Sequence, residues 1–425
     1  GMRLDSTVSF PWNMTLGAIK DNKLIKKTGY NIGEHCKRLG IHFNFAPVVD
    51  INTNPKNPII GNRSFGEDRG NVTNKALAFM QGMQEAGVLA SAKHFPGHGD
   101  TETDSHKTLP TISFSEQRID SVELYPYKQL IKNDLASVMV AHLNIPSLEP
   151  KEGIPSTLSE NIVTNLLKKK LQFKGLIFTD ALNMKGASNF SKSEDIDLAA
   201  FKAGNDMLLI SGNISKGIDK ITEAYNDGDI TEERLAHSVK KILMAKYKVG
   251  LNNYKPVVMA NLVEDLNRLQ DDVLNETLIE NALTVVKNNT SLLPLRQLET
   301  KTIAYVKLGD DNGSIFLDEL KKYTKVHEIS AKNLDELISK LNNYNTVIVG
   351  FHKSNESPWK DYKFSNKELL WLYEIARTNT TILSVFAKPY ALLDLKTSEN
   401  LESILVAYQN SAIAQQKAAQ LIFGA

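Results

Sequence analysis

The chain has 425 residues, of which 42% are hydrophobic and 23% charged, as expected for a folded protein of two domains. Its net charge of +1 gives no general electrostatic attraction to nucleic acid or to an anionic membrane. The single cysteine, Cys36, excludes an internal disulfide and a zinc site built from several cysteines. No apolar run approaches the ~20 residues of a membrane span. We therefore expect neither nucleic acid nor a membrane span.

Five short apolar segments in the first 250 residues have the pattern of buried strands, at 41–50, 88–95, 136–143, 175–180 and 206–211. Helical patterns lie near 27–39, 72–86, 115–132, 159–170, 194–203, 215–227 and 231–247. This alternation predicts a parallel sheet with helical crossovers.

Polar residues follow several of these strands: Asp50, Lys93 and His94, His142, and Asp180. Because many strands contribute them, a TIM-type (β/α)8 barrel is favoured over an open sheet with one crevice. Such a barrel has more strands than this segment shows, so we expect its N-terminal strands to be missing from the chain.

The alternation breaks after residue 250 and restarts with a helix near 272–285. Further strands are predicted at 302–308, 324–329, 346–351, 381–386 and 403–408, forming a second parallel sheet in an α/β/α sandwich. The predicted domains are a catalytic barrel at 1–250, a linker at 251–275 and the sandwich at 276–425. The chain stops directly after a helical pattern, so we expect it to be incomplete at its C-terminus as well.

The segment "KHFPGHGDTETDSH" (93–106) gathers three histidines and three acidic residues around two glycines. Its spacing matches no established metal template, although His94, His98, Asp100, Asp104 and His106 are ligand types. We therefore expect no metal, which leaves a polar turn or a catalytic loop. In a catalytic loop, Asp104 would orient His106, which can give and take a proton near neutral pH. Gly97 and Gly99 would let such a loop move over a substrate.

Asp180 ends the apolar segment "GLIFTD", where a buried carboxylate needs a partner or a function. It could cap a helix. Alternatively, Asp180 could be a nucleophile, with His106 as the acid/base. Retaining glycoside hydrolysis uses such a pair of nucleophile and proton shuttle, although the usual shuttle is a second carboxylate. Arg63, in "NPIIGNRSFGED", suits a carboxylate, sugar hydroxyls or a surface ion pair. Lys93 and His94 offer hydrogen bonds to neighbouring hydroxyls.

Taken together, these segments resemble glycoside hydrolase family 3, and within it the β-N-acetylglucosaminidases. The resemblance runs across about residues 1–250 in the family's order, and "ALTVVKNNTSLLPL" looks like the start of the family's second domain. It is carried by "FNFAPVVDINTNPKNPIIGNRSFGED", "SAKHFPGHGDTETDSHKTLP", "ELYPYKQLI", "PSTLS" and "GLIFTDALNMKGA".

The resemblance implies a role for each matching residue. Asp180 would be the nucleophile, His106 the general acid/base and Asp104 its orienting partner. The sugar-binding residues would be Arg3, Arg63, Lys93 and His94. Members of the family have an acidic segment before the arginine that Arg3 matches. In this protein, that segment would lie before residue 1.

The expected function is a bacterial, retaining exo-β-N-acetylglucosaminidase without metal or cofactor. Its partner would be an oligosaccharide with a terminal N-acetylglucosamine, from cell-wall (peptidoglycan) fragments or chitin. Three alternatives stay open: a phosphorylase, because a neutral histidine repels phosphate less than a carboxylate would; a β-glucosidase; and a non-catalytic sugar-binding chain with an incomplete barrel. The resemblance favours the periplasm or cell envelope, with the cytoplasm as the alternative.

Overall fold

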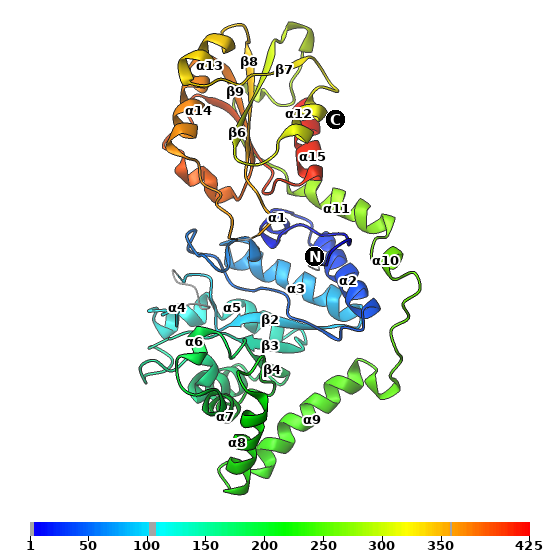
Figure 1. Ribbon diagram of the computed structural model, residues 1–425, viewed down its shortest axis with the longest axis vertical. Coiled ribbons are helices and arrows are strands. Elements are labelled where there is room, and N and C mark those ends of the chain that lie inside the picture. Colours follow the sequence, from blue (N-terminus) through cyan, green and yellow to red (C-terminus); the bar gives the residue numbers. More distant parts are fainter. Residues whose placement is uncertain (1–3, 102–107, 358) are drawn as a thin grey trace. The chain divides into compact units, whose positions relative to one another are not determined.

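The computed structural model describes residues 4–101, 108–357 and 359–425 (Figure 1). Its internal contacts divide the chain into two compact units. The first unit comprises the residues up to Asn13 together with Asp21–Asp272, and the second comprises Met14–Lys20 together with Val273–Ala425. Each unit has its own sheet.

The sheet of the first unit has parallel strands that pair in chain order, β1-β2-β3-β4. They are β1 (Phe43–Asn44), β2 (Leu89–Phe95), β3 (Ser137–Val140) and β4 (Leu176–Thr179). Single parallel bridges join Val48 to Lys93 and Met207 to Phe178. The segments predicted as strands at 41–50 and 206–211 are therefore only partly strand. Pro47 interrupts the first because proline has no N–H to donate to a ladder.

Helices follow the strands of the first unit, as a barrel wall requires. Their bounds are α2 (Asn22–Arg38), α3 (Arg69–Glu85), α4 (Glu116–Ser121), α5 (Tyr125–Ile131), the π-helix η3 (Asn161–Lys170), α6 (Lys185–Ser188), α7 (Ser193–Ala203), α8 (Ile214–Asn226), α9 (Glu232–Lys248) and α10 (Leu262–Asp265). Asp21, Asp68 and Thr231 start α2, α3 and α9 because their side chains accept hydrogen bonds from first-turn N–H groups.

The second unit has a mixed sheet in the order β5-β10-β9-β8-β6-β7. Its strands are β5 (Thr284–Asn288), β6 (Ile303–Gly309), β7 (Val326–Glu328), β8 (Thr346–His352), β9 (Thr380–Phe386) and β10 (Leu401–Val406). The expectation of a purely parallel sheet was wrong, because β5 pairs antiparallel with β10. The segment "TVVKN" that forms β5 is short and half polar, so the sequence gives little indication of this edge strand.

Two helical layers cover the faces of this sheet (Figure 1). One hydrophobic cluster joins the sheet to α13 and α14, through residues such as Leu337 and Leu372. The other joins the opposite face to α12 and α15, through residues such as Phe316 and Ala418. The helices of this part of the chain are α1 (Asn13–Gly17), α11 (Leu269–Ala282), α12 (Ser314–Leu320), α13 (Leu334–Leu341), α14 (Asn366–Thr378) and α15 (Ala412–Phe423).

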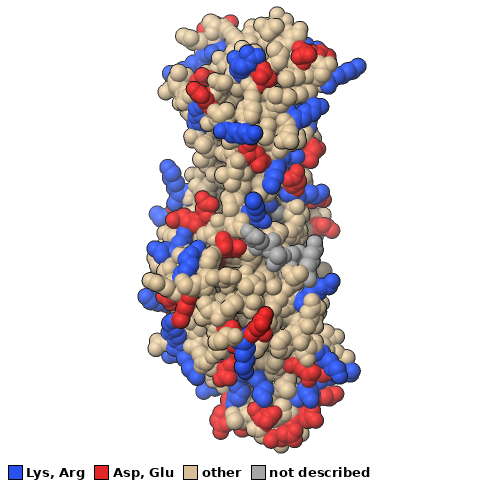
Figure 2. Space-filling model, turned by 90° about the vertical axis from the view of Figure 1, so that its left-hand side faces the viewer, with Lys and Arg blue, Asp and Glu red and all other residues tan. Residues whose placement is uncertain are grey.

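Charged side chains of both signs are interspersed over the face drawn in Figure 2, in keeping with the net charge of +1. Within residues 4–101, 108–357 and 359–425, no helix has the length and apolar character needed to cross a membrane.

Helices α2 and α3 pack with their backbones in close approach. A Cβ atom added at Gly82 would lie 1.9 Å from the carbonyl oxygen of Lys26, and one at Gly29 would lie 2.2 Å from that of Phe79. Real Cβ atoms do not come this close to backbone, so only glycine allows the two helices to touch here.

Gly82→Ala should lower the free energy of unfolding of the first unit by about 2 kcal/mol, because overpacking outweighs the better helix propensity of alanine. Gly70→Ala is the matched control, since its Cβ would meet only the Asp68 side chain at 3.3 Å. Urea unfolding of both variants checks the prediction. Equal stability of the two would show that the helices do not depend on this contact.

Candidate active site

Five polar residues lie where the parallel strands of the first unit end. Asp50 follows the Val48 bridge, Lys93 and His94 lie near the end of β2, His142 follows β3, and Asp180 follows β4 directly. The carboxyl ends of parallel strands share one edge of a sheet, which is where active sites form in barrels. The sequence prediction that these residues share one region is consistent with this arrangement.

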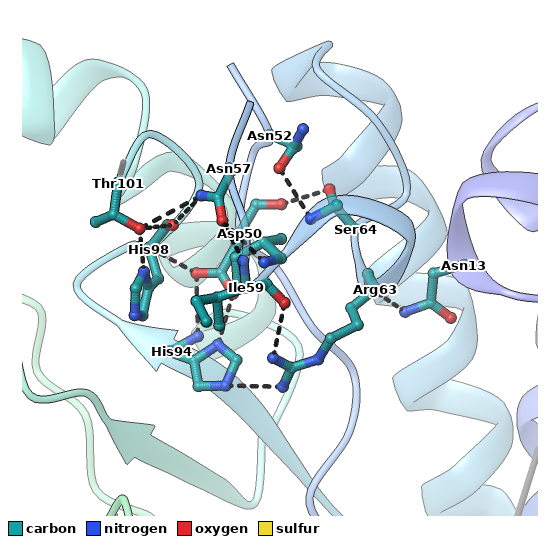
Figure 3. A network of polar contacts seen from close by, with 12 residues as sticks. Asn13, Asp50, Asn52, Asn57, Ile59, Arg63, Ser64, His94, His98 and Thr101 are labelled. Atoms are coloured by element: carbon teal, nitrogen blue, oxygen red, sulfur yellow. Dashed lines mark hydrogen bonds and ion pairs between the residues drawn. The ribbon is translucent and has the colours of Figure 1, made fainter. Parts of the chain in front are cut away.

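The buried carboxylate of Asp50 organises this edge (Figure 3). Its Oδ2 accepts a hydrogen bond from His94 Nδ1 at 2.6 Å. Its Oδ1 accepts from the backbone N–H groups of His94 at 3.2 Å and His98 at 2.8 Å. Burial alone would raise the pKa of Asp50, but the contacts with His94 and His98 outweigh it and hold that pKa below the ordinary value.

The contacts of His94 define its tautomer. Arg63 Nη2 lies 3.2 Å from His94 Nε2, and a guanidinium can only donate, so Nε2 accepts and the proton is on Nδ1. Burial, together with the nearby Arg63 and Lys93, lowers the pKa of His94 despite the opposing effect of Asp50. His94 is therefore a neutral link between a carboxylate and a guanidinium.

Arg63 is held by the loop from which it comes. Its Nη1 donates to the Ile59 carbonyl at 3.1 Å, and its own carbonyl accepts from Asn13 Nδ2 at 2.7 Å (Figure 3). The guanidinium is thereby directed toward His94 and the strand ends.

Lys93 and Asp180 carry the opposite charges of the site. Burial, reinforced by Arg63, lowers the pKa of Lys93 to about 8, although Asp180 and Asp50 oppose the shift. Burial acts to raise the pKa of Asp180, but His94, His142, the Ala181 N–H and Lys93 together lower it. The Ala181 N–H donates to Asp180 Oδ1 at 2.8 Å. Asp180 is therefore an ionised, partly exposed carboxylate at a strand end.

Asp180 does not cap a helix, which was the structural alternative for this residue. The next helix, α6, begins at Lys185 with Met184 at its N-cap position. The backbone N–H of Asp180 instead donates to the Val140 carbonyl at 2.8 Å, which ties the end of β4 to the end of β3.

The loop after β2 is anchored before it reaches residue 102. Asn57 Nδ2 donates to the His98 carbonyl at 2.8 Å, and Thr53 Oγ1 donates to Asp100 Oδ1 at 2.9 Å. A Cβ at Gly99 would lie 1.8 Å from the Ile51 carbonyl oxygen. The sequence suggested that Gly99 provides mobility, but the structure gives this glycine a close-packing role.

Of the predicted site residues, the structure brings together Asp180, Lys93, His94 and Arg63. Arg3, Asp104 and His106 lie outside the described residues. The described part of the chain contains no group of three or more His, Cys, Asp and Glu side chains placed to hold a metal ion.

Sequence reasoning assigned no role to Asp50, which proves central, and interpreted His142 only as a strand-end residue that supports the site. The strand-end position of both residues was the available signal. Their hydrogen-bond partners could not be predicted, because a sequence does not show that Asp50 pairs with a histidine 44 positions away.

Comparison with known proteins identifies a family and several relatives. The sequence model of the family described as "Glycosyl hydrolase family 3 N terminal domain" matches residues 1–245. Beta-hexosaminidase A of Pseudoalteromonas piscicida is 32% identical over 344 residues, which cover 76% of this chain and 56% of that protein. Beta-hexosaminidase of Idiomarina loihiensis is 34% identical over 227 residues, which cover 53% of this chain and 66% of that protein. The chain thus spans less than two thirds of the length of both relatives.

Among solved structures, a glycoside hydrolase family 3 β-N-acetylglucosaminidase from Paenibacillus sp. str. FPU-7 is similar over 100% of this chain and 82% of that chain. The TM-score is 0.79 and the identity 28%. These matches confirm the predicted fold class, a TIM-type barrel followed by an α/β sandwich.

The buried His98 makes the stability of the first unit depend on pH. Burial, with His94 beside it, lowers the pKa of His98 from 6.5 to about 4. Between these values the unfolded chain binds more protons at this position, so stability rises with pH across the window and falls as acid is added. Between pH 7 and 4, the wild type should lose up to about 3 kcal/mol more than His98→Gln.

Urea unfolding at pH 7 and at pH 4.5 measures this difference. His42→Gln, which removes a histidine of the same unit outside the network, is the control variant. An unchanged pH dependence in His98→Gln would mean that His98 titrates alike in the folded and unfolded chain.

Proposed function

Because the chain belongs to glycoside hydrolase family 3, we propose that it is a retaining exo-β-N-acetylglucosaminidase that works through a covalent glycosyl-Asp180 intermediate. The observation that carries the proposal is the ionised carboxylate of Asp180 at the end of β4, surrounded by cationic and hydrogen-bonding groups. A carboxylate held in its charged form is ready to attack an electrophilic carbon without first losing a proton.

Three described residues would bind the sugar. Lys93 and Arg63 supply N–H donors, and both lie within electrostatic range of His94. His94 also joins Arg63 to Asp50 through hydrogen bonds. A donor held in place like Arg63 suits a sugar hydroxyl, because it needs no rearrangement when the sugar binds. Arg3 would be a fourth binding residue, on the basis of the sequence alone.

His106, oriented by Asp104, would be the proton shuttle. The assignment rests on the sequence and on the anchoring of the loop by Asn57 and Thr53 just before these residues. A histidine can donate and accept a proton within one turnover near neutral pH.

The reaction would run in two displacements. In the first, His106 gives its proton to the glycosidic oxygen as the bond between that oxygen and the anomeric carbon breaks, and Asp180 bonds to that carbon. In the second, water attacks the anomeric carbon, the bond to Asp180 breaks, and neutral His106 takes a proton from the water. Two inversions at one carbon give net retention.

The proposed substrate is an oligosaccharide with N-acetylglucosamine at its non-reducing end, as in peptidoglycan fragments or chitin oligomers. The names of the relatives, which are β-hexosaminidases and a β-N-acetylglucosaminidase, support this choice. Comparison of 4-nitrophenyl N-acetyl-β-glucosaminide with 4-nitrophenyl β-glucoside separates it from a β-glucosidase. Faster turnover of the glucoside would overturn the substrate assignment.

Asp180→Ala should lower kcat for 4-nitrophenyl N-acetyl-β-glucosaminide by at least about 10³-fold, because the covalent route is lost. Asp227→Asn, an exposed carboxylate of the same unit, should retain wild-type activity. Initial rates at saturating substrate check both. An Asp180→Ala variant with substantial activity would exclude the proposed nucleophile. Sugar binding without turnover by the folded wild type would instead favour a non-catalytic sugar-binding chain.

His106→Ala should lose about 10²- to 10⁴-fold in kcat on a substrate with a poor leaving group, as expected when a general acid is removed. With a 2,4-dinitrophenyl leaving group, which needs no protonation, formation of the glycosyl-enzyme should be nearly as fast as in the wild type. Stopped-flow release of dinitrophenol measures this step. Equal losses on both substrates would contradict the acid/base role.

Phosphate added to the same assays tests the alternative acceptor. A hydrolase should release free N-acetylglucosamine at a rate that phosphate does not increase. Stimulation by phosphate, with N-acetylglucosamine 1-phosphate as the product, would replace hydrolysis by phosphorolysis as the function.

A further inference from the structure

We propose that His142 is a positioning residue for the candidate nucleophile, holding the backbone that follows Asp180 with Thr157 as its support. The proposal rests on the proposed function of Asp180 as nucleophile. His142 lies two residues after the end of β3 and is 1% exposed. Thr157 comes from the short 3₁₀ helix η2 (Ser156–Leu158) and is also buried.

The first contact fixes Ala181, the residue next to the nucleophile. His142 Nε2 lies 2.9 Å from the Ala181 carbonyl oxygen. A carbonyl only accepts, so Nε2 carries a proton and donates it. The N–H group of Ala181 donates in turn to Asp180 Oδ1 at 2.8 Å. Ala181 is thus held at its carbonyl by His142 while its amide holds one oxygen of the nucleophile.

The strand end around Asp180 is tied on the β3 side as well. The Asp180 N–H donates to the Val140 carbonyl at 2.8 Å. Together with the His142 contact, this gives β3 and the residues after it two connections to Asp180 and Ala181. The carboxylate therefore has little freedom to change its direction unless one of these connections breaks.

The second contact fixes the imidazole ring itself. His142 Nδ1 forms a hydrogen bond with the hydroxyl of Thr157. The same hydroxyl lies 2.8 Å from the Ala141 carbonyl, and the Thr157 carbonyl accepts from Asn205 Nδ2 at 2.8 Å. With a partner at each nitrogen, the ring has one orientation.

These contacts indicate positioning rather than proton transfer. Both ring nitrogens of His142 are engaged by the protein, so neither is available to exchange a proton with a substrate. Its effect on Asp180 is indirect, through the Ala181 backbone and through the field that helps to keep the carboxylate ionised. Small errors in the position of a nucleophile cost about 10²-fold in rate.

Two substitutions at His142 separate the two contacts. Gln places its amide N–H groups at about the reach of Nε2, so His142→Gln can still donate to the Ala181 carbonyl. Asn is shorter and reaches only the position of Nδ1, so His142→Asn keeps a partner for Thr157 and loses Ala181. On 4-nitrophenyl N-acetyl-β-glucosaminide, His142→Asn should lose about 10²-fold in kcat with KM changed by no more than a few-fold. His142→Gln should recover to within about 10-fold of the wild type.

Thr157→Val and Thr157→Ser form a second pair, which keeps the test available if His142→Asn does not fold. Val preserves the shape of threonine without the hydroxyl and should lower kcat, whereas Ser restores the hydroxyl and should restore kcat. Equal kcat for His142→Asn and His142→Gln, or for Thr157→Val and Thr157→Ser, would overturn the positioning role.

Covalent labelling distinguishes failure of this proposal from failure of the proposed function. The probe is 5-fluoro-N-acetyl-β-glucosaminyl fluoride, and the modified residue is identified by peptide mass. Label on Asp180 in the wild type, formed about 10²-fold more slowly in His142→Asn, would support both assignments. Label on Asp180 at an unchanged rate in His142→Asn would overturn the positioning role alone. Label on a different carboxylate in the wild type would overturn both.

Discussion

The site depends on one buried carboxylate, Asp50, that accepts three hydrogen bonds from two residues. A buried charge is unfavourable unless it is neutralised or hydrogen-bonded. Here the compensation comes from the backbone of His94 and His98 and from the His94 ring, so stabilising the charge also fixes the end of β2. The same bond sets the tautomer of His94 and, through its Nε2, the direction of Arg63.

The arrangement also lets Lys93 and Asp180 each keep a charge at the strand ends. Lys93 has a lowered pKa of about 8 because it is buried beside Arg63, yet it remains largely charged at neutral pH. Asp180 stays ionised because its polar surroundings, which include Lys93 and the Ala181 N–H, outweigh its burial and lower its pKa. Lys93 and the proposed nucleophile Asp180 can therefore both keep their charges, which the proposed two-step displacement on a sugar requires.

The sequence predicts the strand-helix order, the two sheets and the strand-end positions of Lys93, His94 and Asp180, because buried parallel strands are continuous apolar segments with polar residues at their ends. It does not predict the pairing of Asp50 with His94 or of His142 with Ala181, since these contacts join different strands. It also misses β5, whose short segment carries little apolar signal, and the packing role of Gly99 against Ile51.

The loop after β2 is anchored to the hydrogen-bond network around Asp50. Asn57 bonds the carbonyl of His98, while the N–H of the same His98 bonds Asp50. The loop that leads to Asp104 and His106 thus starts from His98, which is held on both sides by the network that orients the proposed sugar-binding groups. A proton shuttle must meet the glycosidic oxygen while the nucleophile meets the anomeric carbon, so the two need a common frame. Asp50 would supply this frame on the β2 side, and His142 would complete it at Ala181, beside the proposed nucleophile.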